Sequence, residues 1–192
     1  DYHKSFPARS SAFLYGESTP NYSRLIRCHE RIKAYNPDIK LILSLRNPID
    51  RAYSHWNMRR SELQEKRTFD EVVAAEMAHI EQHGIHQKGA GGYLSRGLYT
   101  AQIESLLLHF RKDHILFLKY EDFRSNNAQA MQTVFSFLGL EDPAPTKELK
   151  SNVVPYSSAI SEKMRRQLVD YFEEDMLKLE RLIGWDCSDW RA

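Results

Sequence analysis

Two short runs of consecutive apolar residues stand out along the chain, each lying between stretches with helical spacing. The first run, 40–45, reads Lys-Leu-Ile-Leu-Ser-Leu, and the second, 114–118, reads His-Ile-Leu-Phe-Leu. Near-continuous apolar runs of this length are typical of strands that are buried on both faces, as in a parallel sheet. The segment 11–17 predicts a further short strand, which leads into a polar turn at 18–21.

The remaining apolar positions recur with the period of an amphipathic helix. Helices are predicted over 23–35, from Asn47 onward, and over 69–82, 98–110, 128–138 and 161–183. Asn47 can cap its helix, Pro48 suits the first helical position and Asp50 lies in the first turn. Because strands alternate with helices, we expect a three-layer α/β domain whose mainly parallel central sheet is flanked by helices. No repeat or linker divides the chain, so residues 1–192 form a single domain.

Charge and composition exclude several classes of protein. The 27 Lys and Arg residues balance 26 Asp and Glu, which disfavours non-specific nucleic-acid binding. A hydrophobic content of 42% argues against disorder, and no apolar run is long enough for a transmembrane helix. Two cysteines, Cys28 and Cys187, are too few for a disulfide framework and lack metal-binding spacing. We therefore expect a cytoplasmic protein with free thiols, no membrane span and no nucleic-acid partner, in an oligomeric state that the sequence leaves open.

Arg46 lies where the first buried strand ends and the helix capped by Asn47 begins. Ligands of α/β sheets bind at the carboxyl ends of strands, and a helix N-terminus offers free N–H groups to anions. Ser54 follows Asn47 by seven residues, close to two helical turns, and therefore shares its face. A guanidinium and a hydroxyl in this arrangement can hold a phosphate group. The spacing equally allows a salt bridge from Arg46 to Asp50 or Glu17.

The whole stretch 40–54, Lys-Leu-Ile-Leu-Ser-Leu-Arg-Asn-Pro-Ile-Asp-Arg-Ala-Tyr-Ser, resembles a known phosphate-binding motif. It is similar to the motif with which sulfotransferases bind the 3′-phosphate of 3′-phosphoadenosine 5′-phosphosulfate (PAPS), above all in the bacterial and heparan sulfate branch. Other segments resemble this branch in the same order, namely 2–7, 16–22, 96–99, 115–123 and 182–185. The resemblance covers essentially the whole chain. It implies the sulfotransferase fold, which is related to that of P-loop NTPases, and transfer of a sulfuryl group from PAPS, leaving PAP.

The resemblance also implies roles for individual residues. In the family, the arginine and the serine eight positions later hold the 3′-phosphate, which assigns this role to Arg46 and Ser54. Glu17 corresponds to the catalytic glutamate of the heparan-type enzymes and is the candidate general base, with a structural pairing to Arg46 or Arg51 as the alternative. Lys150 falls where the family closes a basic loop over the nucleotide.

The acceptor side carries less specific signals. His3 and Lys4 lie in the segment that resembles the approach to the acceptor, and Tyr93 and Arg96 are candidates to line the nucleotide or acceptor side. Tyr93 equally fits an ordinary loop aromatic. The resemblance implies that no metal is needed, and His83 and His86 lack a set of partners for zinc. The acceptor is a small molecule or a glycan, and hydroxyl and amine acceptors both stay open.

One element of the family pattern is missing. The family begins with a strand and a Lys-x-Gly-Thr-Thr loop that holds the 5′-phosphosulfate, and this sequence contains no such loop. We expect that about 50 residues, the size of a strand–loop–helix unit, precede Asp1 in the native protein. The alternative is a non-catalytic relative that binds a nucleotide or a glycan. A kinase-like transferase is disfavoured, because no Gly-x-x-x-x-Gly-Lys-Ser/Thr loop or metal-binding acidic pair is present.

Overall fold

The computed structural model describes residues 14–62, 64–85, 92–141, 156 and 158–192. The helices are α1 (Asn21–Arg24), α2 (Arg27–Tyr35), α3 (Pro48–Ser61), α4 (Phe69–His83), α5 (Thr100–His109), α6 (Tyr120–Ser125), α7 (Asn127–Leu138) and α8 (Glu162–Ile183). Three short 3-10 turns are η2 (Ser95–Gly97), η3 (Lys112–His114) and η4 (Ser188–Trp190), and the strands are β1 (Leu41–Leu45) and β2 (Ile115–Lys119).

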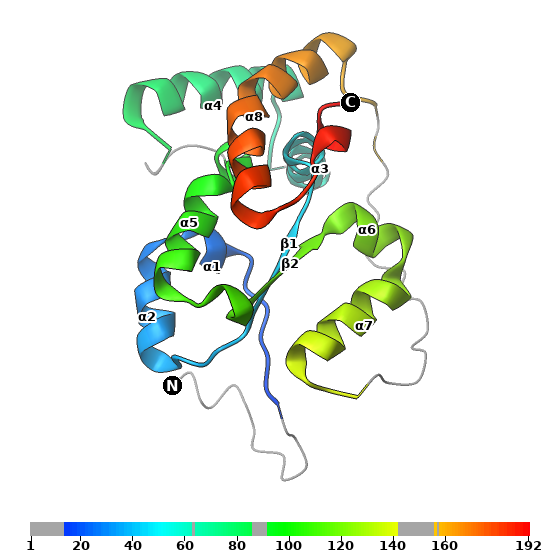
Figure 1. Ribbon diagram of the computed structural model, residues 1–192. Helices are drawn as coiled ribbons and strands as arrows, with labels where there is room; N and C mark the ends of the chain where they lie inside the picture. Colours follow the sequence, from blue (N-terminus) through cyan, green and yellow to red (C-terminus); the bar gives the residue numbers. More distant parts are fainter. Residues whose placement is uncertain (1–13, 63, 86–91, 142–155, 157) are drawn as a thin grey trace.

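The two strands form a parallel pair between layers of helices. Leu41 of β1 pairs with Ile115 of β2, and the register continues to Leu45 and Lys119. Helices α2 and α5 lie on one side of the pair and α7 lies on the other (Figure 1). The predicted three-layer α/β architecture with a parallel sheet is therefore confirmed, although the sheet within the described part of the chain has two strands.

The segment 11–17 does not behave as predicted. Its described part, residues 14–17, is not a strand, and the Leu14 and Tyr15 side chains are 51% and 49% exposed. A strand needs a neighbour to satisfy its backbone groups, and neither β1 nor β2 pairs with this segment. The prediction that β1 is buried on both faces is also wrong. Residues of β1 alternate, and Ile42 is 42% exposed, because the helical cover on that side is incomplete.

Most helices begin and end where local signals predicted. The Asn47 side chain accepts hydrogen bonds from the backbone N–H groups of Ile49 (2.9 Å) and Asp50 (3.4 Å), and so caps α3. Gly139 adopts a left-handed conformation, with φ of +72°, and ends α7. The helix expected over 23–35 is divided, because the chain turns between α1 and α2.

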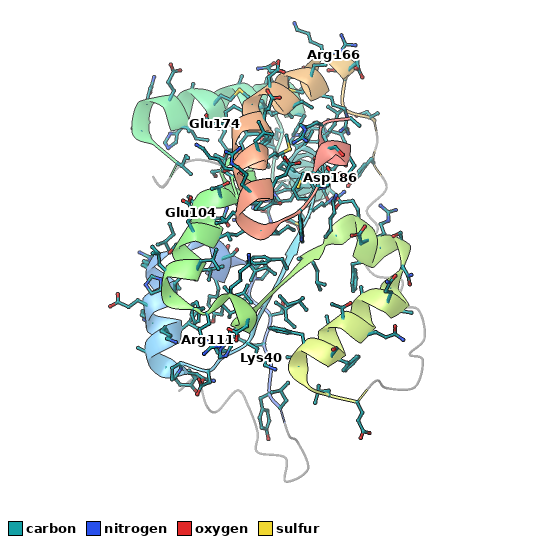
Figure 2. The ribbon with its side chains drawn as sticks, viewed as in Figure 1. Lys40, Glu104, Arg111, Arg166, Glu174 and Asp186 are labelled. Atoms are coloured by element: carbon teal, nitrogen blue, oxygen red, sulfur yellow. The ribbon has the colours of Figure 1, made fainter. Side chains whose placement is uncertain are left out.

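Helices α3, α4, α5 and α8 share one apolar core. Phe172 of α8, Ile49 of α3 and Trp190 of η4 are fully buried there, as is Leu94 just before η2. Charged side chains such as Glu104 and Glu174 lie on the outer surfaces of helices α5 and α8, and Arg111 is exposed just after α5 (Figure 2). Among the described residues, no helix combines the length and the apolar character that crossing a membrane requires.

Candidate active site

Arg46 follows the last residue of β1, and its backbone and side chain are held by different elements. Its carbonyl accepts a hydrogen bond of 2.8 Å from the Tyr99 hydroxyl. Burial raises the pKa of Tyr99 to about 12, so this hydroxyl remains a donor at neutral pH. The guanidinium lies over the ring of Tyr120, 4.9 Å from its centre, and reaches the Tyr156 hydroxyl at 3.5 Å. Two aromatic residues thus orient a cation at the carboxyl end of the sheet.

The turn from β1 to α3 is fixed by contacts from three sides. The Asn47 backbone N–H donates to Glu121 Oε1 at 3.0 Å, and the Asn47 side chain donates to the Trp190 carbonyl at 3.3 Å. Asn47 is only 4% exposed. Its side-chain nitrogen donates to Trp190 and its side-chain oxygen caps α3, so both polar atoms of the side chain have partners. The direction in which Arg46 leaves the strand is therefore set by residues distant in sequence.

Neither of the ion pairs considered for Arg46 forms. Asp50 instead pairs with Arg165 of α8 at 2.8 Å, and Glu17 makes no salt bridge with Arg46. Within the described ranges, no carboxylate pairs with the Arg46 guanidinium. The cation is consequently available to an anion from outside the chain.

Ser54 lies on α3, two turns beyond the cap, and is half-buried. The neighbouring Tyr53 is anchored, because its hydroxyl donates to the Ser158 carbonyl at 2.7 Å and its ring packs edge-on against Tyr156. An unpaired guanidinium, a serine on the following helix and the N-terminus of a 14-residue helix are a donor set suited to a phosphate group. The residues present therefore fit the 3′-phosphate that the family resemblance implies.

Other predicted site residues occupy different environments. Glu17 is exposed and accepts a hydrogen bond from the Thr19 hydroxyl at 3.5 Å. Tyr93 is 3% exposed, and its hydroxyl donates to Glu65 at 3.2 Å, while Arg96 is half-buried in η2. His3, Lys4 and Lys150 lie outside the described residues.

Sequence reasoning places Glu121 at the same edge of the sheet as Arg46 but gives Tyr99 and Trp190 no role there. Tyr99, Glu121 and Trp190 lie 53, 74 and 143 positions away from the atoms that they contact. Tyr120 and Glu121 directly follow β2. Because β1 and β2 are parallel, residues that follow β2 lie at the same edge of the sheet as Arg46, and this position is the signal that the sequence carries for them.

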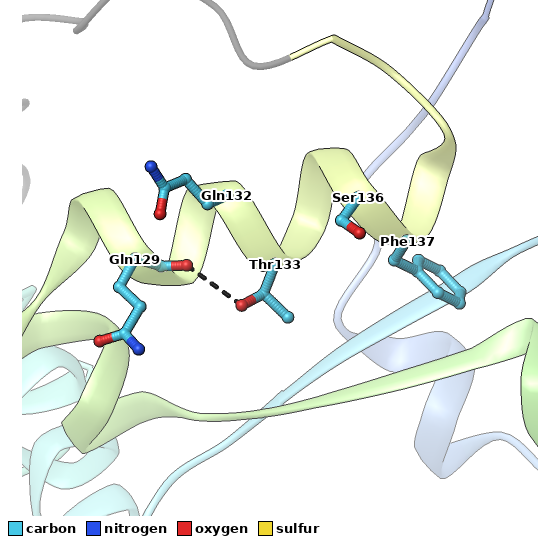
Figure 3. A pocket seen from close by; sticks show the side chains of 5 residues that line it. All are labelled: Gln129, Gln132, Thr133, Ser136 and Phe137. Carbon is cyan, nitrogen blue, oxygen red and sulfur yellow. Dashed lines mark hydrogen bonds between the residues drawn. The ribbon is translucent and has the colours of Figure 1, made fainter.

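Two surface hollows do not coincide with this site. One lies along α7 and is lined by uncharged residues of that helix, which Figure 3 shows together with the hydrogen bond from the Thr133 hydroxyl to the Gln129 carbonyl. The other lies between β2, α6, α7 and the C-terminal segment. Lys119 lines this second hollow, and its ammonium group contacts Asp189 at 2.6 Å and the Asp186 carbonyl at 2.9 Å. Among the described residues, no three His, Cys, Asp or Glu side chains are grouped to hold a metal ion.

The chain is similar to several known proteins. It is 32% identical over 137 residues to the bifunctional heparan sulfate N-deacetylase/N-sulfotransferase 1 of Xenopus tropicalis, which covers 70% of this chain and 15% of that protein. It is 28% identical over 152 residues to the human heparan sulfate glucosamine 3-O-sulfotransferase 6, which covers 79% of this chain and 42% of that protein. The chain thus spans less than half the length of either relative.

A solved structure and a family comparison extend this likeness to the fold. The crystal structure of a sulfotransferase from Alicyclobacillus acidocaldarius matches with a TM-score of 0.84 at 28% identity, covering 100% of this chain and 73% of that one. The sulfotransferase domain family matches residues 18–177, a range that includes Arg46 and Ser54 and begins directly after Glu17. The chain therefore belongs to the sulfotransferase domain family.

Proposed function

We propose that this protein transfers a sulfuryl group from PAPS to a hydroxyl or amine of an acceptor. The observation that carries the proposal is the Arg46 guanidinium, which is held over Tyr120 at the carboxyl end of β1 without a carboxylate partner among the described residues. In a chain of the sulfotransferase domain family, such a cation beside a helix N-terminus suits the 3′-phosphate of the nucleotide.

In this proposal, each residue of the candidate site has a distinct role. Arg46 and Ser54 bind the 3′-phosphate, and the bonds from Tyr99 and Asn47 keep Arg46 in place before the nucleotide arrives. Such preorganisation avoids an ordering cost at the moment of reaction. PAPS, when bound, supplies the sulfuryl group, and Glu17 accepts the proton that the acceptor loses. Glu17 lies on the solvent-exposed segment that precedes α1.

The acceptor is proposed to be a small molecule or a glycan. The names of the relatives favour the glycan, because they specify heparan sulfate glucosamine and carbohydrate as the groups modified. Sugars carry both hydroxyl and amine groups, so the proposed chemistry suits either position.

The 3′-phosphate assignment is tested with two nucleotides and two arginines. Replacing Arg46 by Ala removes a charge-assisted contact worth about 1.5–3 kcal/mol, so PAP should bind about 10- to 100-fold more weakly. Adenosine 5′-monophosphate lacks the 3′-phosphate, so its affinity should change little. Arg60→Ala is the matched control, because Arg60 also lies over an aromatic ring, that of Trp56, but is exposed on α3. Calorimetry with the full-length protein gives both affinities, and an equal loss for both nucleotides would contradict the assignment.

The role of Glu17 is tested by turnover. Glu17→Gln keeps the shape of the side chain and removes its basicity, so kcat should fall by about 10²- to 10⁴-fold while PAP affinity is unchanged. Glu30→Gln on the exposed face of α2 should leave both quantities unchanged. Full activity of the Glu17 variant would exclude this residue as the base, and absence of sulfuryl transfer by the unmodified full-length protein would favour the non-catalytic alternative.

A further inference from the structure

A second group of basic side chains, whose contacts differ from those of Arg46, forms no salt bridge with a carboxylate among the described residues. The Nε atoms of Arg24, Arg51 and Arg96 are buried without a hydrogen-bond partner, and so is Nδ1 of His55. These residues come from α1, α3 and η2, so the group is assembled by the fold and not by one helix. We call these four residues the basic cluster.

Three members of the basic cluster lie beside residues 92 and 93, and the fourth, Arg24, is close enough to Arg96 to lower its pKa. Arg51 donates from Nη2 to the carbonyls of Gly92, at 3.4 Å, and Tyr93. The His55 ring lies 4.9 Å from the Tyr93 ring. Arg96 passes so close to Gly92 that a Cβ atom there would lie 2.8 Å from Arg96 Nε, and Gly92 itself has a φ of +75°. Only glycine leaves room for the guanidinium at this point.

Burial and the neighbouring arginines both lower pKa values within the basic cluster. Burial lowers the pKa of Arg96, and the nearby Arg24 and Arg59 lower it further. Burial likewise lowers the pKa of His55 to about 4, with Arg51 and Arg96 as additional causes. The imidazole is therefore neutral at pH 7, whereas the guanidinium groups keep their charge.

The nearest carboxylates are engaged elsewhere. Both oxygens of the buried Glu76 accept backbone hydrogen bonds, from Tyr93 at 2.7 Å and Ser95 at 3.0 Å. Glu65 pairs with Arg67 at 2.8 Å. Over the residues that the structure places, Arg24, Arg51 and Arg96 form no salt bridge. Glu76 offsets part of the positive charge but leaves an excess.

Buried charges in proteins are normally paired, and buried donors without partners are rare. Because Arg51, His55 and Arg96 lie beside residues 92 and 93 and each keeps a buried nitrogen without a partner, we propose that the basic cluster is a second anion-binding site, which binds an oxyanion group of a ligand other than the nucleotide. The half-buried Arg24 and Arg96 give such a group access, and Arg51 provides the charge at its base. The fitting chemistry is a sulfate ester or a carboxylate, carried by an acceptor molecule or present as a free ion.

The test uses inorganic sulfate on the full-length protein with PAP present in saturating amount. PAP occupies the proposed Arg46 site, so the remaining response reports the basic cluster. We expect the NMR signals of the Arg51 and Arg96 Nε–H groups to shift and saturate with one sulfate per chain, while sodium chloride of equal ionic strength has no such effect. Arg96→Gln should weaken this binding about tenfold or more, since it removes one charged donor.

Two controls separate the cluster from the rest of the surface and from the proposed function. Arg166→Gln, at the exposed outer end of α8 (Figure 2), should leave sulfate binding unchanged. Arg46→Ala, measured with enough PAP to saturate this variant, should change it less than Arg96→Gln does, so failure of the 3′-phosphate assignment does not affect this result. The thermal unfolding of each variant shows that it is folded.

The outcomes are distinct. Shifts that rise linearly without saturation would mean an adventitious ion only. Saturable shifts that occur in a parallel titration without PAP and vanish with PAP would mean that these arginines bind the nucleotide. Either result overturns the proposal. Saturable binding supports it, and glucosamine 6-sulfate, compared with inorganic sulfate and with unsulfated glucosamine, then identifies the source. Tighter binding of the sulfated sugar indicates an acceptor substituent, and equal binding indicates a free ion.

Discussion

The region around α3, α4, α5 and α8 and the region formed by α6 and α7 differ in how deeply their side chains are buried. The first shares a core that includes fully buried residues such as Phe172 and Trp190. Neither α6 nor α7 has a buried residue, and α7 lies against the sheet on the side where Ile42 is partly exposed. Most of the free energy of packing therefore belongs to the first region.

Arg46 lies at the boundary between these regions. Its carbonyl is bonded by Tyr99 and its neighbour Asn47 by Trp190, both from the packed region, whereas the ring below its guanidinium comes from α6. The backbone of the candidate site is thus rigidly attached, and its side chain rests on the less buried helix. This arrangement separates positioning of the site from the surface that meets a ligand.

The largest expected contrast is in stability. Phe172→Ala in the packed region leaves a cavity among fully buried side chains and should lower the free energy of unfolding by about 3–5 kcal/mol. Phe137→Ala on α7 removes a half-buried ring that lies under Lys40, at 5.2 Å, and should cost about 1 kcal/mol. Urea unfolding of both variants measures the difference, and equal losses would show that α7 is part of the main core.

The two asparagine caps give a smaller contrast. Asn47→Ala removes the cap of α3 and leaves the Trp190 carbonyl without its donor, so it should cost about 2–3 kcal/mol. Asn126 caps α7 through a 3.2 Å bond from the Gln129 N–H but is exposed, so Asn126→Ala should cost about 0.5–1 kcal/mol. Denaturant midpoints of the two variants provide the comparison. A smaller cost at Asn47 would mean that Trp190 does not depend on it.

The smallest expected effect is the pH dependence that His55 gives to the packed region. Burial, with Arg51 and Arg96 nearby, lowers its pKa to about 4, whereas the pKa of the unfolded residue is about 6.5. The unfolded chain therefore binds more protons within this window, and stability falls as the pH falls through it. After allowance for the partial exposure of the ring, His55→Asn should reduce the stability difference between neutral pH and pH 4 by about 1–2 kcal/mol. An unchanged difference would show that this imidazole titrates normally.

The fold could be predicted from the sequence where local signals decide. The apolar runs located β1 and β2, and the cap at Asn47 and the glycine at 139 located helix ends to within a residue. The failure at residues 14–17 has a physical cause, because a strand is stable only with a partner and a single segment does not reveal one. Burial of β1 was overestimated for a related reason. The residues of a strand do not show how completely each face is covered.

The sequence by itself determined the elements, the parallel pair and the likelihood of an anion site at Arg46, since strand ends, caps and helical spacing depend on nearby residues. Only the tertiary structure decided that Asp50 pairs with Arg165 and so leaves Arg46 unpaired, and that Tyr99, Glu121 and Trp190 fix its place. It also decided that three arginines from separate elements keep buried Nε atoms without a hydrogen-bond partner and form no salt bridge among the described residues. Charge compensation depends on distances between atoms, and those distances are set by packing of residues far apart in the chain.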